Sequence, residues 1–418
     1  MANEVYNTMY RFNGQISTTG YVSVIQSSDV VSIAFIHNYD TATYPVIRLR
    51  IFADMETITH LTDHPDDIRV AITLYGNIYK TDTDSNTNSI VQPVNEITIS
   101  GKGYIENKNA PVSSMDHYKS GVKDSTDLNV DSKVPCELFI YDDNISHRMR
   151  ERVKSVYENA TIETVSRDIL KQVGFPENNI VIAPMQNQTR YAQILIPNLM
   201  AIESFTFFDR YFGIYQSGGL LYCDLTSGST IVYLSDTYGP NVTSNGVIPI
   251  YVRSEKNNSN GESGIFTSGG KYMMQTQALN VSILTESDIE SVMNPTYTVA
   301  ANVVTRQLEA SEIPILSDDK YQQSITAKQI LHKYDNQYLA STVSARIGEK
   351  ITEIDLAGAG FDISLFKPNS RIQLVFESPI RGMDMCKLTR IRGVTHVLTN
   401  ASGDLFASQT TMQLCSNY

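Results

Sequence analysis

The sequence predicts a mainly β protein of the α+β class, in which two sheet-rich regions flank a compact α/β block. Apolar and polar residues alternate along short segments near both ends of the chain, as they do in half-buried strands. A central block instead has apolar residues at helical spacing between short strands. The chain has no Trp but 24 Tyr and 14 Phe, and such residues suit the pleated surface of a sheet.

Composition narrows the class of protein. The 418 residues carry 45 acids against 33 bases, a net charge of −12, which argues against a general nucleic-acid binder. Cys136, Cys223, Cys386 and Cys415 lie far apart, so neither a disulfide scaffold nor a zinc ribbon is expected. No apolar run approaches the roughly 18 residues of a membrane helix. We therefore expect a soluble protein of several domains, made in a reducing compartment, without membrane insertion.

Residues 1–137 are expected to be mostly sheet, with one short helix. Period-two alternation predicts strands at 30–36, 47–51, 68–74 and 97–99. Met55, Ile58 and Leu61 have helical spacing within 53–64, and a proline follows directly. Polar stretches are expected as loops at 81–89 and 107–133.

Residues 138–225 are expected to form the α/β domain. Thr161 is a predicted N-cap of a helix that ends before Gly174. Asn198 is the expected cap of a second, aromatic-rich helix, which Gly213 follows. Short strands are expected at 180–182, 193–196, 214–215 and 220–223, the last two joined as a hairpin.

The remaining chain divides into a mixed β segment with a linker at 226–335 and a second sheet region at 336–418. In the mixed segment, alternation predicts strands at 231–234, 247–252 and 279–284, a polar loop at 254–270 and a helix at 325–333. In the second sheet region, strands are expected at 372–376, 388–398 and 406–414. Gly393 predicts a bulge, and the turn 400–403 joins the last two strands.

Recognisable catalytic motifs are missing from the sequence. There is no Walker loop, GxSxG or HExxH, which argues against NTPases, common hydrolases and zincins. The best metal candidate is His60 with His64, one helical turn apart, completed by Asp63 or Asp66. A polar helix end before a strand explains these residues better. We therefore assign no catalytic, cofactor-binding or metal-ligating residue, and we expect no cofactor.

Three other groups of chemically capable residues have simpler explanations. Asp142–Asp143 and Asp318–Asp319 are expected in solvated turns rather than as paired glycosidase carboxylates. His396 is expected to be packed or hydrogen-bonded within a strand. The aromatic cluster is interpreted as a helix packed on a sheet, with a binding groove as the alternative; it comprises Phe205, Phe207, Phe208, Tyr211 and Phe212.

Motifs of the central block occur in a recognisable order, at 161–175, 193–199, 205–215 and 220–224. A helix ending in glycine precedes a strand, and a second helix precedes a Gly-Ile-Tyr sequence and a strand ending in Asp. This order resembles the central domain of bacteriophage tail baseplate hub proteins, including late-control tail proteins, which are related to the upper part of type VI secretion spikes. Residues 354–358 and 367–372, with Gly382, Ile391 and His396 in the following strands, resemble that group's second barrel.

The resemblance implies an architecture of two tube-like antiparallel β-barrel domains, at 1–137 and 336–418, with the α/β hub domain between them. It also implies a non-enzymatic homotrimer whose six barrels form a pseudo-hexameric ring in the tail baseplate of a virion. The ring would join a central spike protein below to a tail tube or tube-initiator protein above, with a tape measure protein as a further partner.

Genome ejection would send DNA through the channel of this ring without specific binding, and assembly would take place in the host cytoplasm. An acidic lining of the channel would repel phosphates and let DNA slide. Two other functions stay open: a receptor- or carbohydrate-binding tail adhesin, which the Tyr-, Asn- and Ser-rich composition would suit, and a tail-associated cell-wall lysin.

Overall fold

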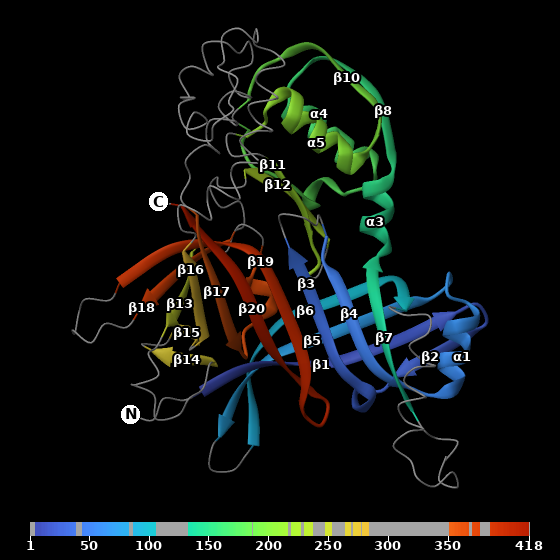
Figure 1. Cartoon of the computed structure of the whole chain (residues 1–418), viewed down its shortest axis with the longest axis vertical. Helices are drawn as coiled ribbons and strands as arrows, with labels where there is room; N and C mark the ends of the chain where they lie inside the picture. The colour runs from blue at the N-terminus through green and yellow to red at the C-terminus, as the bar shows by residue number, and fades with distance from the viewer. Residues whose placement is uncertain are drawn as a thin grey trace, which may run out of the picture.

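The computed structural model describes most of the chain outside the segment 284–350. The described residues are 5–38, 44–82, 87–105, 133–185, 187–215, 219–226, 230–236, 247–252, 264–268, 271–276, 278–283, 351–367, 370–376 and 385–417. Strands dominate among them, which confirms the mainly β class predicted from the sequence (Figure 1). The expected helix 325–333, the pair Asp318–Asp319 and the polar segment 107–133, apart from Lys133, lie outside the described residues.

Eight strands close into an antiparallel barrel (Figure 1). Their hydrogen-bonded order is β19-β3-β4-β7-β6-β5-β1-β20, and pairing of β20 with β19 completes the circle. The strands are β1 (Val5–Thr18), β3 (Val30–Asn38), β4 (Val46–Ala53), β5 (Arg69–Asp82), β6 (Thr87–Ile105), β7 (Val134–Asp142), β19 (Met385–Ser402) and β20 (Leu405–Asn417). Closure leaves no free edge within this circle of strands.

Alternation along the strands fills the barrel with apolar side chains. On β4, Ile47, Leu49 and Ile51 are buried, whereas Arg48 and Arg50 between them point outward. Each fully buried Ile or Leu contributes about 1.5–3 kcal/mol relative to an exposed one. The expected loop at 81–89 is shorter than predicted, because β5 runs to Asp82 and β6 begins at Thr87, where cross-strand pairing continues.

The hairpin of β19 and β20 belongs to two sets of strands. One edge of β19 pairs with β3 along 393–399 and with β18 (Arg371–Phe376) along 385–390. The outer edge of β20 pairs with β1 along 405–407 and with β17 (Ile351–Ala359) along 409–417. The barrel is therefore built from strands near both ends of the sequence. The domain boundaries expected from the sequence stay a prediction.

Two local features of this hairpin agree with the sequence. The pairing of β19 with β20 shifts register between Ile391 and Gly393, at the predicted bulge. Gly403 has a φ of +59° in the turn between the strands. This left-handed conformation is open to glycine without a steric penalty.

The second set of strands continues from β17 and β18 and contains four more: β13 (Val247–Val252), β14 (Gly264–Ser268), β15 (Lys271–Thr276) and β16 (Ala278–Ile283). β13, which lies in the segment expected to be mixed β, runs parallel to both β15 and β18. β14 lies within the stretch expected to be a polar loop at 254–270. β14 forms there because Ile265 and Phe266 pair with both β15 and β1. A prediction from the local Gly and Ser content does not take these distant strands into account.

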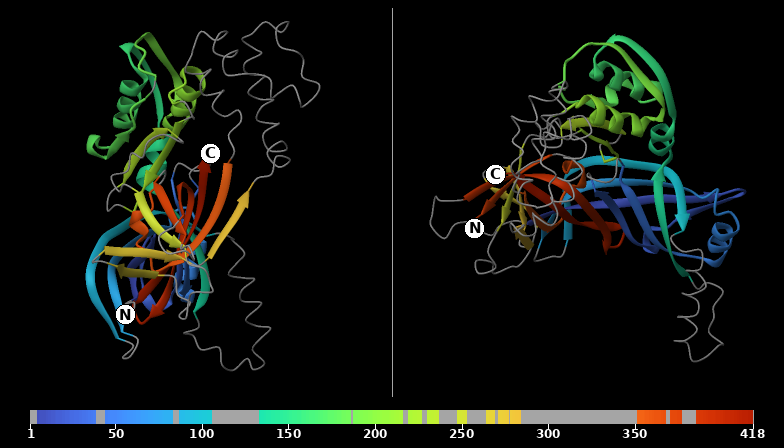
Figure 2. Two further views of the ribbon diagram at one scale, coloured as in Figure 1. Left: turned by 90° about the vertical axis from the view of Figure 1, so that its left-hand side faces the viewer. Right: turned by 45° about the horizontal axis from the view of Figure 1, so that its top comes forward.

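The α/β unit follows β7 directly and lies beside the barrel (Figure 2). Its helices are α3 (Asp143–Arg150), α4 (Ile162–Gln172) and α5 (Ala201–Phe212). One sheet pairs β8 (Arg152–Ala160) with β10 (Tyr191–Met200), and the other orders β11 (Gly219–Asp224), β12 (Ile231–Asp236) and β9 (Ile180–Ile182). The predicted cap Thr161 accepts from the Thr164 amide at 3.2 Å, and Gly174 has a φ of +93°.

Two expectations for this unit were wrong. Asn198 does not cap α5; it lies in a bulge of β10 with a φ of +40°, and the helix begins at Ala201 because Glu203 accepts from the Met200 amide at 2.9 Å. Ile214 and Tyr215 form no strand, so the expected hairpin with β11 is absent. Instead β11 pairs with β12, and the buried Tyr215 hydroxyl donates to the Ala183 carbonyl at 2.7 Å.

The predicted short helix is α1 (Met55–Asp63), which Asp54 caps by accepting from the Thr57 amide at 2.7 Å. It packs beside β2 (Tyr21–Ile25), where Tyr21 stacks on His60 and lies within hydrogen-bond distance of Thr57; β2 extends the sheet from β1. In the part of the chain that the structure describes, no helix combines the length and apolar character needed to cross a membrane.

Gly101 on β6 tests the tightness of barrel closure. A Cβ atom at this position would lie 2.2 Å from the Tyr141 carbonyl oxygen of β7, a backbone atom that cannot move aside. We expect Gly101→Ala to lower the free energy of unfolding by about 3 kcal/mol. Gly403→Ala is the control: nothing lies within 4 Å of its Cβ, and only its positive φ costs about 1 kcal/mol. Urea unfolding measures both, and equal losses would contradict the prediction.

Candidate functional site

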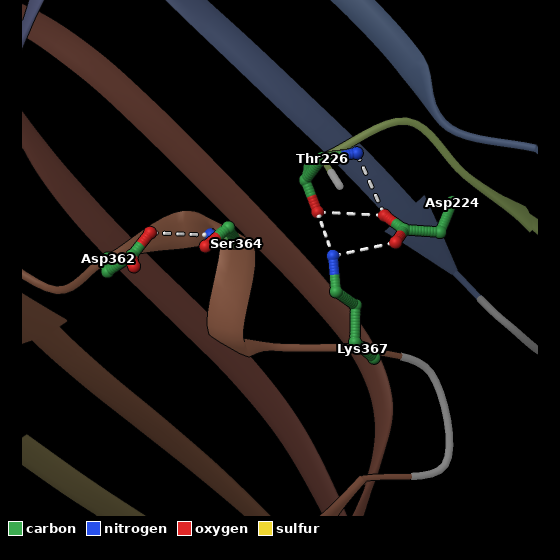
Figure 3. Close-up of polar contacts among 5 residues, drawn as sticks. All are labelled: Asp224, Thr226, Asp362, Ser364 and Lys367. Atoms are coloured by element: carbon green, nitrogen blue, oxygen red, sulfur yellow. Dashed lines mark hydrogen bonds and ion pairs between the residues drawn. The ribbon is translucent and has the colours of Figure 1, made fainter. Parts of the chain in front are cut away.

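A buried ion pair links the α/β unit to the second set of strands. The Lys367 ammonium lies 2.6 Å from Asp224 Oδ2, and the two side chains are only 6% and 5% exposed (Figure 3). The ammonium also donates to Thr226 Oγ1 at 2.7 Å. The Thr226 amide and hydroxyl both donate to Asp224 Oδ1, at 2.8 Å and 2.7 Å. Both charged groups therefore have close polar partners in a place that water barely reaches.

Local structure explains why these side chains meet. Asp224 is the last residue of β11, where an apolar strand ends and its carboxylate turns back to Thr226. Lys367 follows the short helix η5 (Ile363–Leu365), in the connection between β17 and β18. Removing one partner of such a pair leaves an uncompensated charge in the interior, which is strongly destabilising. The contact therefore fixes how β11 lies against the strands around η5.

A second buried contact joins the barrel to the same connection. The Tyr10 hydroxyl on β1 donates to Asp362 Oδ1 at 3.2 Å and accepts from the Ile363 amide at 3.0 Å. Asp362 also accepts from the Ser364 amide at 2.9 Å and so caps η5. Burial, and secondly the Asp362 charge, raise the pKa of Tyr10 well above its ordinary value. Tyr10 therefore stays neutral and serves as a structural link.

Gly360 makes two backbone hydrogen bonds between the strand sets. Its amide donates to the Ser408 carbonyl, and its carbonyl accepts from the Thr8 amide, each at 2.8 Å. Its φ is +71°, and a Cβ atom would lie 2.3 Å from Asn7 Oδ1. Only glycine fits this combination of conformation and space. One residue thus bridges β1 and β20.

His396 lies in the same interior region, on β19. Its side chain is buried, and Nδ1 is 2.9 Å from Thr410 Oγ1, so it is packed and hydrogen-bonded as expected. Burial is the main cause that lowers the pKa of His396 to about 3, and Lys367 and His37 lower it further. The imidazole is therefore neutral near pH 7.

The candidate metal ligands do not gather into a metal site. The His60 ring stacks on the Tyr21 ring with ring centres 4.1 Å apart, and the centres of the His60 and His64 rings are 6.4 Å apart. Asp67 accepts from the Thr19 hydroxyl at 2.7 Å. Across the described ranges, no three or more His, Cys, Asp or Glu side chains are grouped so that they could hold a metal ion.

The other singled-out residues have structural partners. Asp142 is not in a solvated turn: it is buried and caps α3 by accepting from the Ile145 amide at 3.0 Å, while Asp143 forms an ion pair with Arg69. In the aromatic cluster of α5, Phe205 and Phe208 are buried in the core. The helix therefore packs on the sheet as interpreted.

Two of the cysteines, Cys136 and Cys223, are free and buried. Burial raises the pKa of the Cys136 thiol to about 12 and that of the Cys223 thiol still further. Thiols of this kind are protonated and inert at neutral pH.

Sequence reasoning missed both buried links. The strand ending in Asp224 and the segment starting at Lys367 each belonged to a motif of the resemblance, but nothing in the sequence indicated that they pair. A charged residue directly after a run of apolar ones was the available signal, because such a residue needs a partner if it is buried.

The family model described as bacteriophage PBS1 gene 109 protein matches residues 4–381. The chain therefore belongs to the bacteriophage PBS1 gene 109 protein family, which agrees with the phage resemblance found in the sequence. No curated protein matches this chain.

Solved structures with a similar arrangement come from phage tails and secretion systems. The 43 kDa tail protein of prophage MuSo2 from Shewanella oneidensis is 9% identical, with a TM-score of 0.41 over 96% of each chain. A tail protein from Neisseria meningitidis MC58 is 9% identical, with a TM-score of 0.42 over 97% of each chain. An E. coli component of the type VI secretion system is 10% identical, with a TM-score of 0.39 over 96% of this chain and 76% of that chain. Because these scores lie below 0.5, none of the three carries an inference about function.

The Lys367–Asp224 pair predicts a large effect of single substitutions. Lys367→Met leaves the Asp224 carboxylate buried without its cation, and we expect a loss of about 3–5 kcal/mol in the free energy of unfolding. Adding Asp224→Leu removes the orphaned charge and restores part of that loss. Lys171→Met is the control, because the ion pair of Lys171 with Glu177 is exposed and should matter little. Chemical denaturation of all three variants measures their free energies of unfolding. A Lys367→Met protein as stable as the unmodified protein would refute the structural role of this ion pair.

His396 predicts a stability that falls with acid. The folded pKa of about 3 lies below the ordinary value of 6.5, so the unfolded chain takes up a proton here first. Stability present above pH 6.5 is lost as pH falls toward 3, with a limiting slope of about 1.4 kcal/mol per pH unit. His396→Gln does not titrate and should flatten the slope between pH 6.5 and 5 in urea titrations. If the free energy of unfolding of this variant fell with pH as steeply as that of the unmodified protein, groups other than His396 would cause the loss of stability in acid.

Proposed function

We propose that this member of a phage protein family is a structural hub of the tail baseplate. Three copies surround an open axis and form a ring of six similar strand sets. The ring fits a sixfold tail tube or tube-initiator protein above and a threefold spike protein below. DNA and the tape measure protein pass through its centre during genome ejection.

The single observation that carries this proposal is the shared hairpin. β19 and β20 pair with the barrel strands β3 and β1 along one half, and with β18 and β17 along the other. One chain therefore holds two neighbouring sets of strands side by side at a fixed spacing. Three such chains present six units to their partners, which is the adaptation that joining sixfold and threefold assemblies requires.

The polar interior suits a mechanical role rather than catalysis. The Lys367–Asp224 pair and the Tyr10–Asp362 contact each join elements that lie far apart in the sequence. These groups are buried and bonded to one another, so they stiffen a junction and face no substrate. A protein that transmits force between a spike and a tube needs such a rigid junction.

The net charge of −12 per chain fits a channel for DNA. Acidic side chains lining the axis repel phosphates, and the repulsion keeps the passing duplex off the wall. In this role the protein needs no base contacts and no specific DNA affinity.

Measuring the particle mass tests the proposal. We expect sedimentation of the full chain, alone at high concentration or with spike and tube proteins, to give three copies per particle. Negative-stain images should then show a threefold particle with an axial opening. A particle that stays monomeric and poreless with these partners would overturn the hub function. Glycan binding or clearing of cell-wall substrate by the free chain would favour an adhesin or a lysin instead.

A further inference from the structure

The buried ion pair of Lys367 and Asp224 brings a nucleophile close to a carboxyl group. The Lys367 nitrogen lies 2.6 Å from Asp224 Oδ2 (Figure 3). Because a carbon–oxygen double bond is only about 1.2 Å long, the same nitrogen lies no farther than about 3.8 Å from the carboxyl carbon. A small movement of either side chain therefore brings these two atoms to the roughly 3–3.5 Å from which a bond can form.

Thr226 completes a closed ring of polar contacts around this pair. Its hydroxyl accepts from the Lys367 ammonium at 2.7 Å and donates to Asp224 Oδ1, also at 2.7 Å. A hydroxyl group both accepts and donates, so Thr226 takes up a proton from the ammonium while its own proton passes to the carboxylate. This relay converts the ion pair into an amine and a carboxylic acid, and no water molecule takes part.

Burial penalises the charged pair and protects an uncharged product. The Lys367 and Asp224 side chains are only 6% and 5% exposed, so both charges have lost most of their hydration. The attraction between two buried charges can be smaller than this loss. A neutral amide that keeps its polar partners avoids the cost of buried charge. Water also barely reaches the site, which slows hydrolysis of such an amide.

We propose that Lys367 and Asp224 condense to form an isopeptide bond, an amide between the two side chains, with Thr226 as the proton relay. The pair is then a modification site that joins the end of β11 covalently to the connection between β17 and β18. The α/β unit is thereby linked to the second set of strands. This inference goes beyond the proposed hub function and requires only the folded chain.

The reaction consumes only the two side chains. After the relay, the lone pair of the Lys367 nitrogen forms a bond to Asp224 Cγ. A second nitrogen proton passes through the Thr226 hydroxyl to Oδ1, the Cγ–Oδ1 bond breaks with its electron pair on oxygen, and one water molecule leaves. Oδ2 stays as the carbonyl oxygen, and the third proton stays on the amide nitrogen. The condensation involves no oxidation or reduction and needs no co-reactant.

The backbone of Thr226 also assists this reaction. Its amide N–H donates to Asp224 Oδ1 at 2.8 Å. A donor fixed by the main chain holds the carboxyl group in one orientation and draws electron density away from Cγ. Cγ is therefore more easily attacked than the carbon of a carboxyl group that lies free in solvent.

The exposed pair of Lys171 and Glu177 is an internal control. Its nitrogen and oxygen are 2.8 Å apart, nearly as close as in the buried pair. The two side chains are 39% and 62% exposed, so water hydrates both charges and stabilises the ionised forms. We expect no covalent bond between them.

Mass spectrometry of the full chain tests the inference directly. The purified protein, denatured before the measurement, should weigh less than its sequence by the mass of one water molecule. Digestion with trypsin should give residues 211–253 joined to residues 351–371, the two peptides that contain Asp224 and Lys367. Fragmentation of the joined peptide should locate the bond between these two side chains.

Two variants separate the covalent bond from the ion pair. Lys367→Arg keeps a cation beside Asp224, but a guanidinium stays protonated and does not attack, so this variant should keep its full sequence mass. Thr226→Val removes the relay hydroxyl and keeps the backbone amide. After a pulse of isotope labelling in the expressing cells, this variant should lose water about 100-fold more slowly than the unmodified chain. Thr226→Ser restores the hydroxyl and should restore the reaction, and circular dichroism should show that the variants are folded.

The outcomes decide between a covalent bond and an ion pair. An unmodified chain with its full sequence mass would overturn the inference. A loss of water that leaves residues 211–253 and 351–371 as separate peptides would overturn it too. Equal rates in Thr226→Val and the unmodified chain would refute the relay. A full-mass chain that forms trimers would leave the hub function intact, whereas a joined chain that stays monomeric with spike and tube proteins would support the bond and refute the hub.

Discussion

The pairing of β19 and β20 with strands from both halves of the protein is the constraint on which the rest of the architecture depends. The barrel closes only because this hairpin lies between β3 and β1. The second strand set is held beside the barrel because the same two strands continue into pairings with β18 and β17. A relative movement of the two sets would have to break main-chain hydrogen bonds of one continuous hairpin, so the sets behave as one body.

Buried polar contacts complement this hydrogen bonding where the three parts of the molecule meet. Asp224 from the α/β unit pairs with Lys367, and Tyr10 from the barrel bonds Asp362 a few residues earlier. Relative to well-packed apolar residues such groups add little net stability, but each accepts few partner geometries. We interpret them as specifying how the parts are oriented, while the apolar interior supplies most of the free energy of folding.

Features that depend on neighbouring residues could be predicted from the sequence. The alternation at 47–51, the cap at Thr161, the bulge at Gly393 and the turn at 400–403 follow from short-range sterics and hydrogen bonding. Features set by distant partners could not. The start of α5 depends on Glu203 rather than on Asn198, β14 forms only because β15 and β1 accept it, and Lys367 finds Asp224 across the fold.

The order of strands in the barrel also has a consequence for biosynthesis. Residues 385–417 are translated long after β1 to β7, so the nascent chain leaves the ribosome with β1 and β3 lacking their final neighbours. Unpaired strand edges invite aggregation. A polypeptide that terminates prematurely can never supply the missing hairpin, and it is therefore left as a target for chaperones and proteases. The barrel can therefore close only after residues 385–417 have been translated.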